Sequence, residues 1–238
     1  MPRVALPFVG HMNSGERILA RISRTAWLLD TLHQGTIRFA PASSYHDTSL
    51  SAARTDDEMS KSYNRPGQQV TVTGPGGPIP VLGDMIFSSR REIERGGTFK
   101  PVPYWLSCFS TELDPRLFCE FPSVDPTEDG CLVIFDVDAF LRRALPALGP
   151  FAAAKRLIQN NYFDPYHPPP AGVNAIEAKA VGYAYQREAR FVLDPEGGPP
   201  LAGGGPFFLS IGSIEDIAAV YGRDGAKTAG TGPVTFLA

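Results

Sequence analysis

The order of the secondary-structure patterns along the 238 residues predicts an α+β fold. Strand-like patterns dominate both ends of the chain, and helical patterns are confined to an early and a middle segment. Gly and Pro cluster at 74–80, 166–172 and 195–206, which predicts long loops on a single domain over residues 1–238 and no interdomain linker. With 43% hydrophobic residues, a chain of this length can bury a large core.

The first elements are predicted to be a strand, a helix and a second strand. The segment "RILARIS" (17–23) has a strand-like pattern, and "TIRFA" (36–40) has another. Between them, "TAWLLDTLHQG" (25–35) is typical of a helix with Thr25 as its N-cap and Gly35 as its stop signal.

Aromatic and β-branched runs predict further strands in the middle of the chain. These runs cover residues 69–73, 81–87, 102–110 and 131–137. The last of them, "CLVIFDV", is almost continuously apolar, which is typical of a strand covered on both faces.

Two amphipathic patterns follow and predict helices at 138–148, with a kink at Pro146, and at 151–162. The last third returns to strand-like patterns around a short helical turn at 213–217. The strands are expected at residues 177–185, 189–195, 206–211 and 218–222.

The charge and the ends of the chain restrict the class of protein. A formal charge of −3 and a pI near 5.8 argue against strong non-specific binding to nucleic acid. They do not exclude a local groove of basic residues. The apolar stretch within the first 17 residues is too short and too often interrupted by Pro for a signal peptide. No apolar run in the sequence reaches membrane-spanning length. We therefore expect a soluble, cytoplasmic protein.

The cysteines and histidines do not predict a disulfide framework or a metal site. Cys108, Cys119 and Cys131 are odd in number and widely spaced, so they are interpreted as small buried apolar groups. The four histidines are dispersed, and no metal is expected: His11, His33, His46 and His167.

Three polar patches lie on or beside predicted strands. Arg21 stands in the apolar strand "LARIS", and Ser110 and Thr111 end the aromatic strand in "CFSTE". Each has a structural interpretation, Arg21 as an exposed strand residue and the Ser-Thr pair as a strand-end cap. Neither a phosphate-binding glycine loop nor a G-x-S-x-G elbow is present, which argues against the commonest nucleotide-binding and hydrolase classes.

The third patch is "QRE" in "YQREARFVLDP". If a strand begins here, Gln186 and Glu188 point the same way, because side chains alternate along a strand. The structural interpretation is a solvated edge on which Glu188 pairs with Arg190 and adds little stability.

In this order, the three patches resemble the mono-ADP-ribosyltransferase superfamily. The segment "LARISRTAWLLDTLHQGTIRF" is similar to the strand, helix and G-x-I opening of bacterial ADP-ribosylating toxins, and "EARFVLDPEGG" is similar to the strand of their catalytic glutamate. Most of the chain is also similar to an uncharacterised bacterial domain family found among phage-defence genes. That family usually has a tryptophan-centred segment where this chain has "RLFCEF" (116–121).

The resemblance implies two packed, mostly antiparallel sheets with inserted helices, and NAD as co-substrate without a metal. It implies that Glu188 stabilises the oxocarbenium-like transition state and holds a ribose hydroxyl. Arg21 would bind the pyrophosphate, and Gln186 would face the acceptor.

For the other candidate residues the resemblance implies roles around the same ligand. Ser110 and Thr111 would hold the ribose or support Glu188, and Tyr104 or Tyr45 would stack on nicotinamide. A glutamine ahead of the glutamate resembles enzymes that modify amides or nucleobases, so the acceptor is expected to be nucleic acid or a protein side chain.

Three functions stay open at this stage. The first is a toxin or defence effector that transfers ADP-ribose to a macromolecule and has a possible cognate antitoxin. The second is a non-catalytic binding or antitoxin-like module of the same fold. The third, a hydrolase, would use Asp47 or Glu112 with His46.

Overall fold

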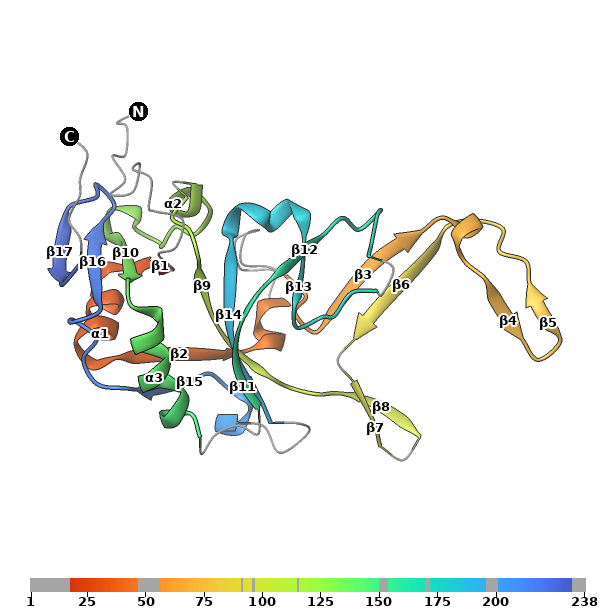
Figure 1. Ribbon diagram of the computed structural model, residues 1–238, viewed down its shortest axis with the longest axis horizontal. Helices are drawn as coiled ribbons and strands as arrows, with labels where there is room; N and C mark the ends of the chain where they lie inside the picture. The colour runs from red at the N-terminus through yellow and green to blue at the C-terminus, as the bar shows by residue number, and fades with distance from the viewer. Residues whose placement is uncertain are drawn as a thin grey trace.

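The computed structural model has an α+β fold, as the sequence predicts (Figure 1). It describes residues 18–46, 56–90, 92–95, 97–114, 116–149, 154–169, 172–195 and 201–232. Within these residues the strands pair antiparallel, with the exception of the short pair β12 (Asn161–Phe163) and β13 (Ala178–Ala180), which is parallel.

Nine strands form one hydrogen-bonded network. Seven of them lie in the order β11 (Ala154–Gln159), β14 (Glu188–Asp194), β9 (Trp105–Ser110), β1 (Leu19–Arg24), β10 (Asp129–Ile134), β16 (Ala218–Gly222) and β17 (Lys227–Gly230). The other two are β2 (Thr36–Pro41), which pairs with β9, and β15 (Phe207–Ser210), which pairs with β2. All six residues of β10 are buried, as its continuous apolar run predicts.

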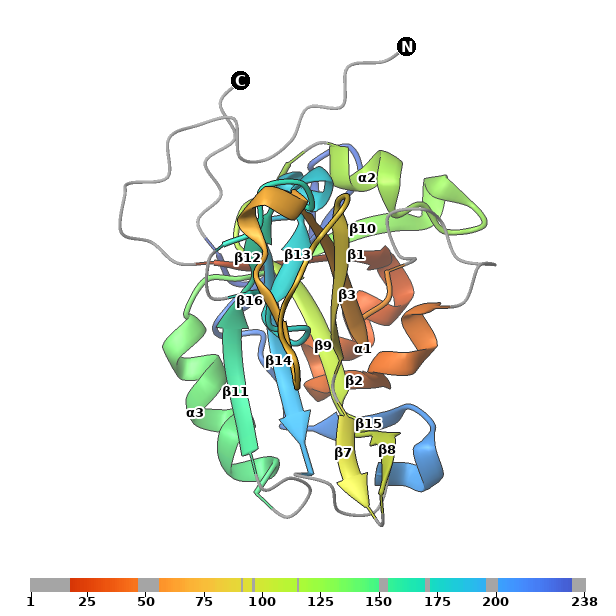
Figure 2. The ribbon, with the colours of Figure 1, turned by 90° about the vertical axis from the view of Figure 1, so that its right-hand side faces the viewer.

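The network divides at β9. Ser110, at the end of β9, pairs with Ala20 of β1, whereas Leu106 of the same strand pairs with Ala40 of β2. The two strands β1 and β2 therefore leave β9 at different points along it. Figure 2 shows β11, β14 and β9 side by side on the other side of this division.

Helices α1 (Thr25–Gln34) and α3 (Val137–Ala147) contribute apolar faces to the main core. Leu28 and Leu32 are the buried residues of α1, and Phe140 of α3 lies against Phe109 with 5.9 Å between ring centroids. A third, short helix is α2 (Arg116–Glu120), and the 3-10 helices are η1 (Ala42–His46), η2 (Gly67–Gln69), η3 (Pro126–Glu128), η4 (Val181–Gln186) and η5 (Leu201–Gly204).

The ends of α1 agree only in part with the prediction. Gly35 follows the helix in the left-handed conformation, at φ 61°, as expected of a stop signal. The N-cap is Arg24 and not Thr25, and the side chain of Arg24 makes no capping hydrogen bond. The helix begins directly at the end of β1, so strand pairing and not a capping side chain sets its start.

The predicted helix over 151–162 is wrong. Residues 154–159 form β11, which pairs along its whole length with β14, and residues 161–163 form β12. The alanines and the lysine of this segment favour a helix locally, but the ladder with β14 overrides that preference. The predicted strand over 177–185 is similarly reduced to β13, because η4 follows it at once.

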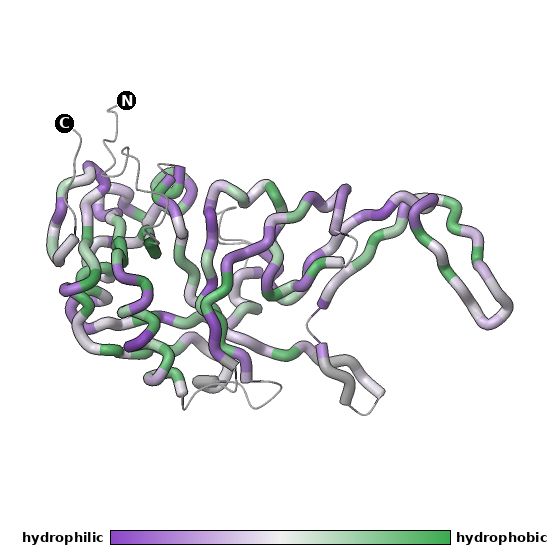
Figure 3. The backbone as a smooth tube through the Cα atoms, viewed as in Figure 1, coloured by the Kyte–Doolittle hydropathy of each residue, from purple (hydrophilic) through white to green (hydrophobic). Residues whose placement is uncertain are grey.

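A two-stranded arm projects from the body (Figure 1). It consists of β3 (Ser60–Arg65) and β6 (Met85–Arg90), and it carries β4 (Val72–Gly74) and β5 (Gly77–Ile79) at its tip. The cluster 74–80, predicted to be a loop, thus contributes to a hairpin. Hydrophobic residues recur in the body and along the arm (Figure 3). A further hairpin joins β7 (Glu92–Arg95) and β8 (Thr98–Pro101).

Gly35→Ala is expected to destabilise the fold. A Cβ at this position would clash with the carbonyl oxygen of Gly212, and the positive φ is itself unfavourable for alanine. We expect a loss on the order of 1–3 kcal/mol in the free energy of unfolding, measured by chemical denaturation. Gly76→Ala is the control, because a Cβ there meets nothing within 4 Å. Equal stability of the two variants would contradict this reading of the helix end.

Candidate functional site

The candidate site centres on Glu188, the first residue of β14. Glu188 pairs with Ser110 of β9, and Ser110 pairs in turn with Ala20 of β1. Arg21 follows Ala20 directly. Three polar patches that are far apart in the sequence therefore lie on three neighbouring strands at the division of the sheet network.

The turn that precedes Glu188 differs from the prediction. Gln186 ends η4, and Arg187 has φ 42°, the one positive φ of a non-glycine residue in the part of the chain that the structure describes. The strand therefore begins at Glu188, and Gln186 is not part of it. The prediction that the side chains of Gln186 and Glu188 share one face of a strand is wrong. Gln186 is buried, and its Nε2 donates to the hydroxyl of Tyr185 at 3.2 Å.

Ser110 and Thr111 hold this turn in place. The Ser110 hydroxyl lies within hydrogen-bonding distance of the carbonyls of Gln186 (2.7 Å) and Glu112 (2.5 Å). The carbonyl of Arg187 accepts from the backbone N–H of Thr111 at 2.8 Å and from its hydroxyl at 3.0 Å. Both residues thus support the backbone from which Glu188 extends.

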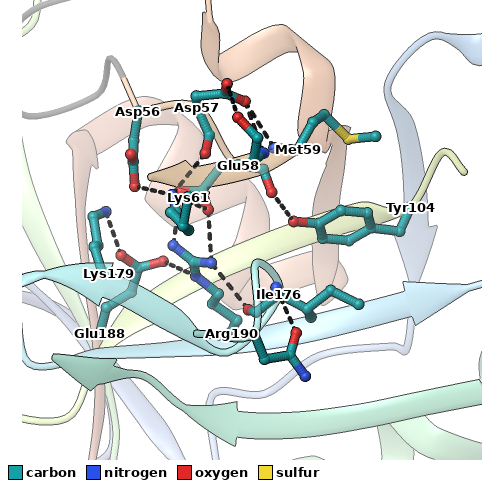
Figure 4. Close-up of polar contacts among 12 residues, drawn as sticks. Asp56, Asp57, Glu58, Met59, Lys61, Tyr104, Ile176, Lys179, Glu188 and Arg190 are labelled. Atoms are coloured by element: carbon teal, nitrogen blue, oxygen red, sulfur yellow. Dashed lines mark hydrogen bonds and ion pairs between the residues drawn. The ribbon is translucent and has the colours of Figure 1, made fainter. Parts of the chain in front are cut away.

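Arg190 lies two residues after Glu188 and is fully buried (Figure 4). Its Nε donates to Glu188 Oε1 at 2.7 Å. Its two terminal nitrogens hold both oxygens of Glu58, each at 2.7 Å, in the bidentate geometry that suits a guanidinium. Nη1 also donates to the carbonyl of Ile176 at 3.1 Å. The predicted Glu188–Arg190 pair therefore forms, but in the interior and not on a solvated edge.

Lysines complete this cluster (Figure 4). Lys179 donates to Glu188 Oε2 at 2.6 Å, and Lys61 lies 2.7 Å from Asp56 Oδ2 and 3.5 Å from Glu58 Oε2. We call Asp56, Glu58, Lys61, Lys179, Glu188 and Arg190 the charge network. Its three carboxylates and three cations balance, which limits the cost of placing charges in the interior.

The charge network keeps Glu188 ionised. Burial by itself would raise the pKa of Glu188, but the charges of Arg190 and Lys179 outweigh it and hold the pKa well below its usual range. Burial would lower the pKa of Lys179, and Glu188 and Glu58 raise it instead. The site thus combines a permanent carboxylate with permanent cations.

Arg21 and Tyr45 lie near this carboxylate. Arg21 is half-buried, donates to Ser107 Oγ at 3.1 Å, and has its guanidinium 5.9 Å from the ring centroid of Phe109. Burial raises the pKa of Tyr45 well above its ordinary value, while the charge of Arg21 lowers it and that of Glu188 raises it further. Tyr45, on η1, is thus an electrostatic neighbour of both candidate residues.

Tyr104 is not placed to stack on a ligand. Its side chain is fully buried, and its hydroxyl donates to the backbone carbonyl of Glu58 at 2.5 Å. Tyr104 therefore packs in the core beneath the segment that carries Glu58, and the predicted stacking role falls to Tyr45 alone.

The two described residues of the hydrolase alternative, Glu112 and His46, are both exposed and have different charged neighbours. Glu112 is exposed and lies 3.5 Å from Arg187, and His46 acts electrostatically on Asp57. Asp47 lies outside the described residues.

Of the cysteines, Cys131 is buried as predicted, whereas Cys119 is exposed and Cys108 is half-buried.

Two residues that the sequence did not single out hold the backbone of Glu188. The N–H of Asn160 donates to the Glu188 carbonyl at 3.0 Å, and the N–H of Glu188 donates to the Tyr162 hydroxyl at 2.7 Å. The predicted helix over this segment concealed both. Glu58 and Lys179 were also missed, and their only signal was charge within short apolar or acidic runs.

Glu188→Gln is expected to lower the free energy of unfolding by about 3–5 kcal/mol at neutral pH, because it removes the carboxylate paired with the buried Lys179 and one of the two carboxylates bound by Arg190. Glu177→Gln breaks the exposed Arg156–Glu177 pair (3.2 Å) and is the control, with an expected loss below about 1 kcal/mol. Chemical denaturation of both variants checks this. Equal, small losses in both variants would contradict the claim that the charge of Glu188 compensates buried cations.

The same comparison predicts a pH dependence. The folded pKa of Glu188 is depressed, so its contribution to stability is fully present above the unfolded pKa of about 4.3 and is lost as the pH falls toward the folded value. The stability difference between the wild type and Glu188→Gln should therefore shrink below that pH. A difference that stays constant or grows toward acid pH would contradict the ionised state.

Comparisons with known proteins give no relative of the chain: no family model, curated protein or solved structure matches it. Within the described residues, no group of three or more His, Cys, Asp or Glu side chains is arranged to hold a metal ion. In that same part of the chain, none of the helices has the length and apolar character needed to cross a membrane.

Proposed function

We propose that the chain is an NAD-dependent mono-ADP-ribosyltransferase that acts in the cytoplasm as a toxin or defence effector on a nucleic acid or a protein side chain. The observation that carries the proposal is that Glu188 and Ser110 oppose each other on adjacent strands, while Arg21 on the next strand shares Tyr45 with Glu188 as an electrostatic neighbour. An anion-binding arginine and a permanent carboxylate at one division of a sheet suit a ligand that carries both a pyrophosphate and a developing positive charge.

Glu188 stabilises the transition state in this proposal. The bond from the ribose C1′ to the nicotinamide nitrogen breaks, nicotinamide leaves with the electron pair, and positive charge develops on the ribose. A carboxylate that stays ionised stabilises that charge. The acceptor then attacks C1′ and loses a proton.

Arg21 binds the pyrophosphate, and Tyr45 packs against nicotinamide. Ser107 engages one of the five N–H groups of the Arg21 guanidinium. Ser110 and Thr111 position Glu188 through the Gln186–Arg187 turn. Gln186 faces the acceptor in this proposal, and its side chain, as buried as that of Glu188, is reached through the same opening of the site.

A specific observation also favours a second function, a non-catalytic binding module of the same fold. Both oxygens of Glu188 are engaged by buried cations, and the residue is only 4% exposed. In the transferase, NAD reaches Glu188 only when the Lys179 and Glu58 segments that lie over it move apart. A binding module requires no such motion and would bind NAD without cleaving it.

Nicotinamide release from labelled NAD distinguishes the two functions. We expect wild-type protein to release nicotinamide and to transfer label to RNA, DNA or protein, and Glu188→Gln to lower the rate about a hundredfold or more. Glu58→Gln is the matched control, because it alters the other buried carboxyl group bound by Arg190 while leaving the Glu188 carboxylate in place. Equal rates for the two variants would remove Glu188 from the chemistry.

Arg21→Ala is expected to weaken NAD binding by tenfold or more, as the loss of one charge-assisted contact of about 1.5–3 kcal/mol implies. Its melting temperature should change little, because the side chain is only half-buried and its hydrogen bond to Ser107 contributes modestly to stability. Arg24→Ala, on the same strand, is the control and should bind NAD as the wild type does. Unchanged NAD affinity together with a large drop in melting temperature would make Arg21 a structural residue.

A further inference from the structure

The side chain of Asn160 is buried without a hydrogen-bond partner. It is 5% exposed, and neither Nδ2 nor Oδ1 has a partner among the described residues. Buried amides in folded proteins are almost always hydrogen-bonded, so an unpaired one needs an explanation. The next residue, Asn161, is exposed and poses no such question.

Asn160 lies opposite Glu188. The ladder between β11 and β14 has Gln159 paired with Ala189, and the hydrogen bond from the Asn160 N–H to the Glu188 carbonyl extends it by one step. Directly opposed residues of antiparallel strands lie on the same face, with Cβ atoms about 5 Å apart. Because Glu188 is itself opposed to Ser110, the amide just after β11, the carboxylate of β14 and the hydroxyl of β9 lie in one row.

The two side chains complement each other chemically. An ionised carboxylate only accepts hydrogen bonds, whereas an amide both donates and accepts. A pair of adjacent hydroxyl groups matches this arrangement, because one hydroxyl donates to the carboxylate and the other accepts from Nδ2 and donates to Oδ1. A ligand of this kind also supplies the partners that Asn160 lacks.

We infer that Asn160 binds the ribose hydroxyl adjacent to the one that Glu188 holds. The inference rests on the proposed function, and it makes the vicinal diol of the nicotinamide ribose the group that the site recognises. Asn160 is thus a substrate-binding residue that fixes the sugar relative to the carboxylate, and it takes no part in bond cleavage.

The test measures NAD binding by the wild type and by Asn160→Leu, which keeps the approximate size of the side chain and removes both polar atoms. We expect about tenfold weaker binding, as the loss of one hydrogen bond implies, with an unchanged or raised melting temperature. Asn161→Leu is the matched control on the exposed neighbour and should bind as the wild type does. Asn160→Ala repeats the test without the branched side chain, in case leucine does not fit.

NAD analogues that each lack one hydroxyl of the nicotinamide ribose provide the second readout. The wild type should bind one of the two analogues about tenfold more weakly than it binds NAD. Asn160→Leu should bind that analogue as tightly as it binds NAD, because the variant has already lost the contact to the missing hydroxyl. Wild-type affinity for NAD in both Asn160 variants, or full additivity with both analogues, would overturn the inference and leave the transferase proposal intact. A wild-type protein that neither binds nor cleaves NAD would overturn both.

Discussion

The hydrogen bonds and ion pairs of the Arg190 guanidinium are the interactions on which the arrangement of the arm, the Ile176 loop and the sheet network depends. Its three nitrogens bind Glu188 of its own strand, both oxygens of Glu58 and the carbonyl of Ile176. Glu58 is 132 residues away in the sequence, on the segment that leads into the arm. One buried side chain therefore attaches the base of the arm and the Ile176 loop to the main sheet network.

A cation buried so completely must be neutralised, and this need explains the rest of the charge network. Glu58 and Glu188 compensate Arg190, Lys179 compensates the remaining negative charge, and Lys61 pairs with Asp56. Because removing one member leaves another uncompensated, the six side chains stabilise the fold only as a set. The same balance keeps Glu188 charged in the interior of the protein. Structural stability and the proposed chemistry thus use one carboxylate.

The sequence predicts the parts of the fold in which local pattern and tertiary pairing agree. The continuous apolar run around Leu132 is a buried strand, and Gly35 ends its helix in the left-handed conformation. Prediction fails over 154–159, where alanine and lysine favour a helix and the ladder with β14 imposes a strand. It also fails at Arg187, because a positive φ at a non-glycine residue has no local signature.

The candidate site shows the same limit. Arg21, Ser110 and Glu188 stand out as polar residues on strand-like segments, and the sheet order places their strands side by side. Glu58 and Lys179 carry no comparable signal, since their role depends on a pairing partner far away in the sequence. Asn160 was hidden by the error in secondary structure, because its place opposite Glu188 exists only if the preceding residues form a strand.

The most direct test of this account is the titration of the Glu188 side-chain carboxyl by carbon-detected NMR, with its resonance assigned by comparison with Glu188→Gln. The account predicts that the chemical shift stays constant as the pH falls through about 4.3, the ordinary value for glutamate, and changes only at more acid pH. A midpoint at or above that value would show that Lys179 and Arg190 do not hold the carboxylate ionised, and would contradict both the charge network and the chemistry proposed for it.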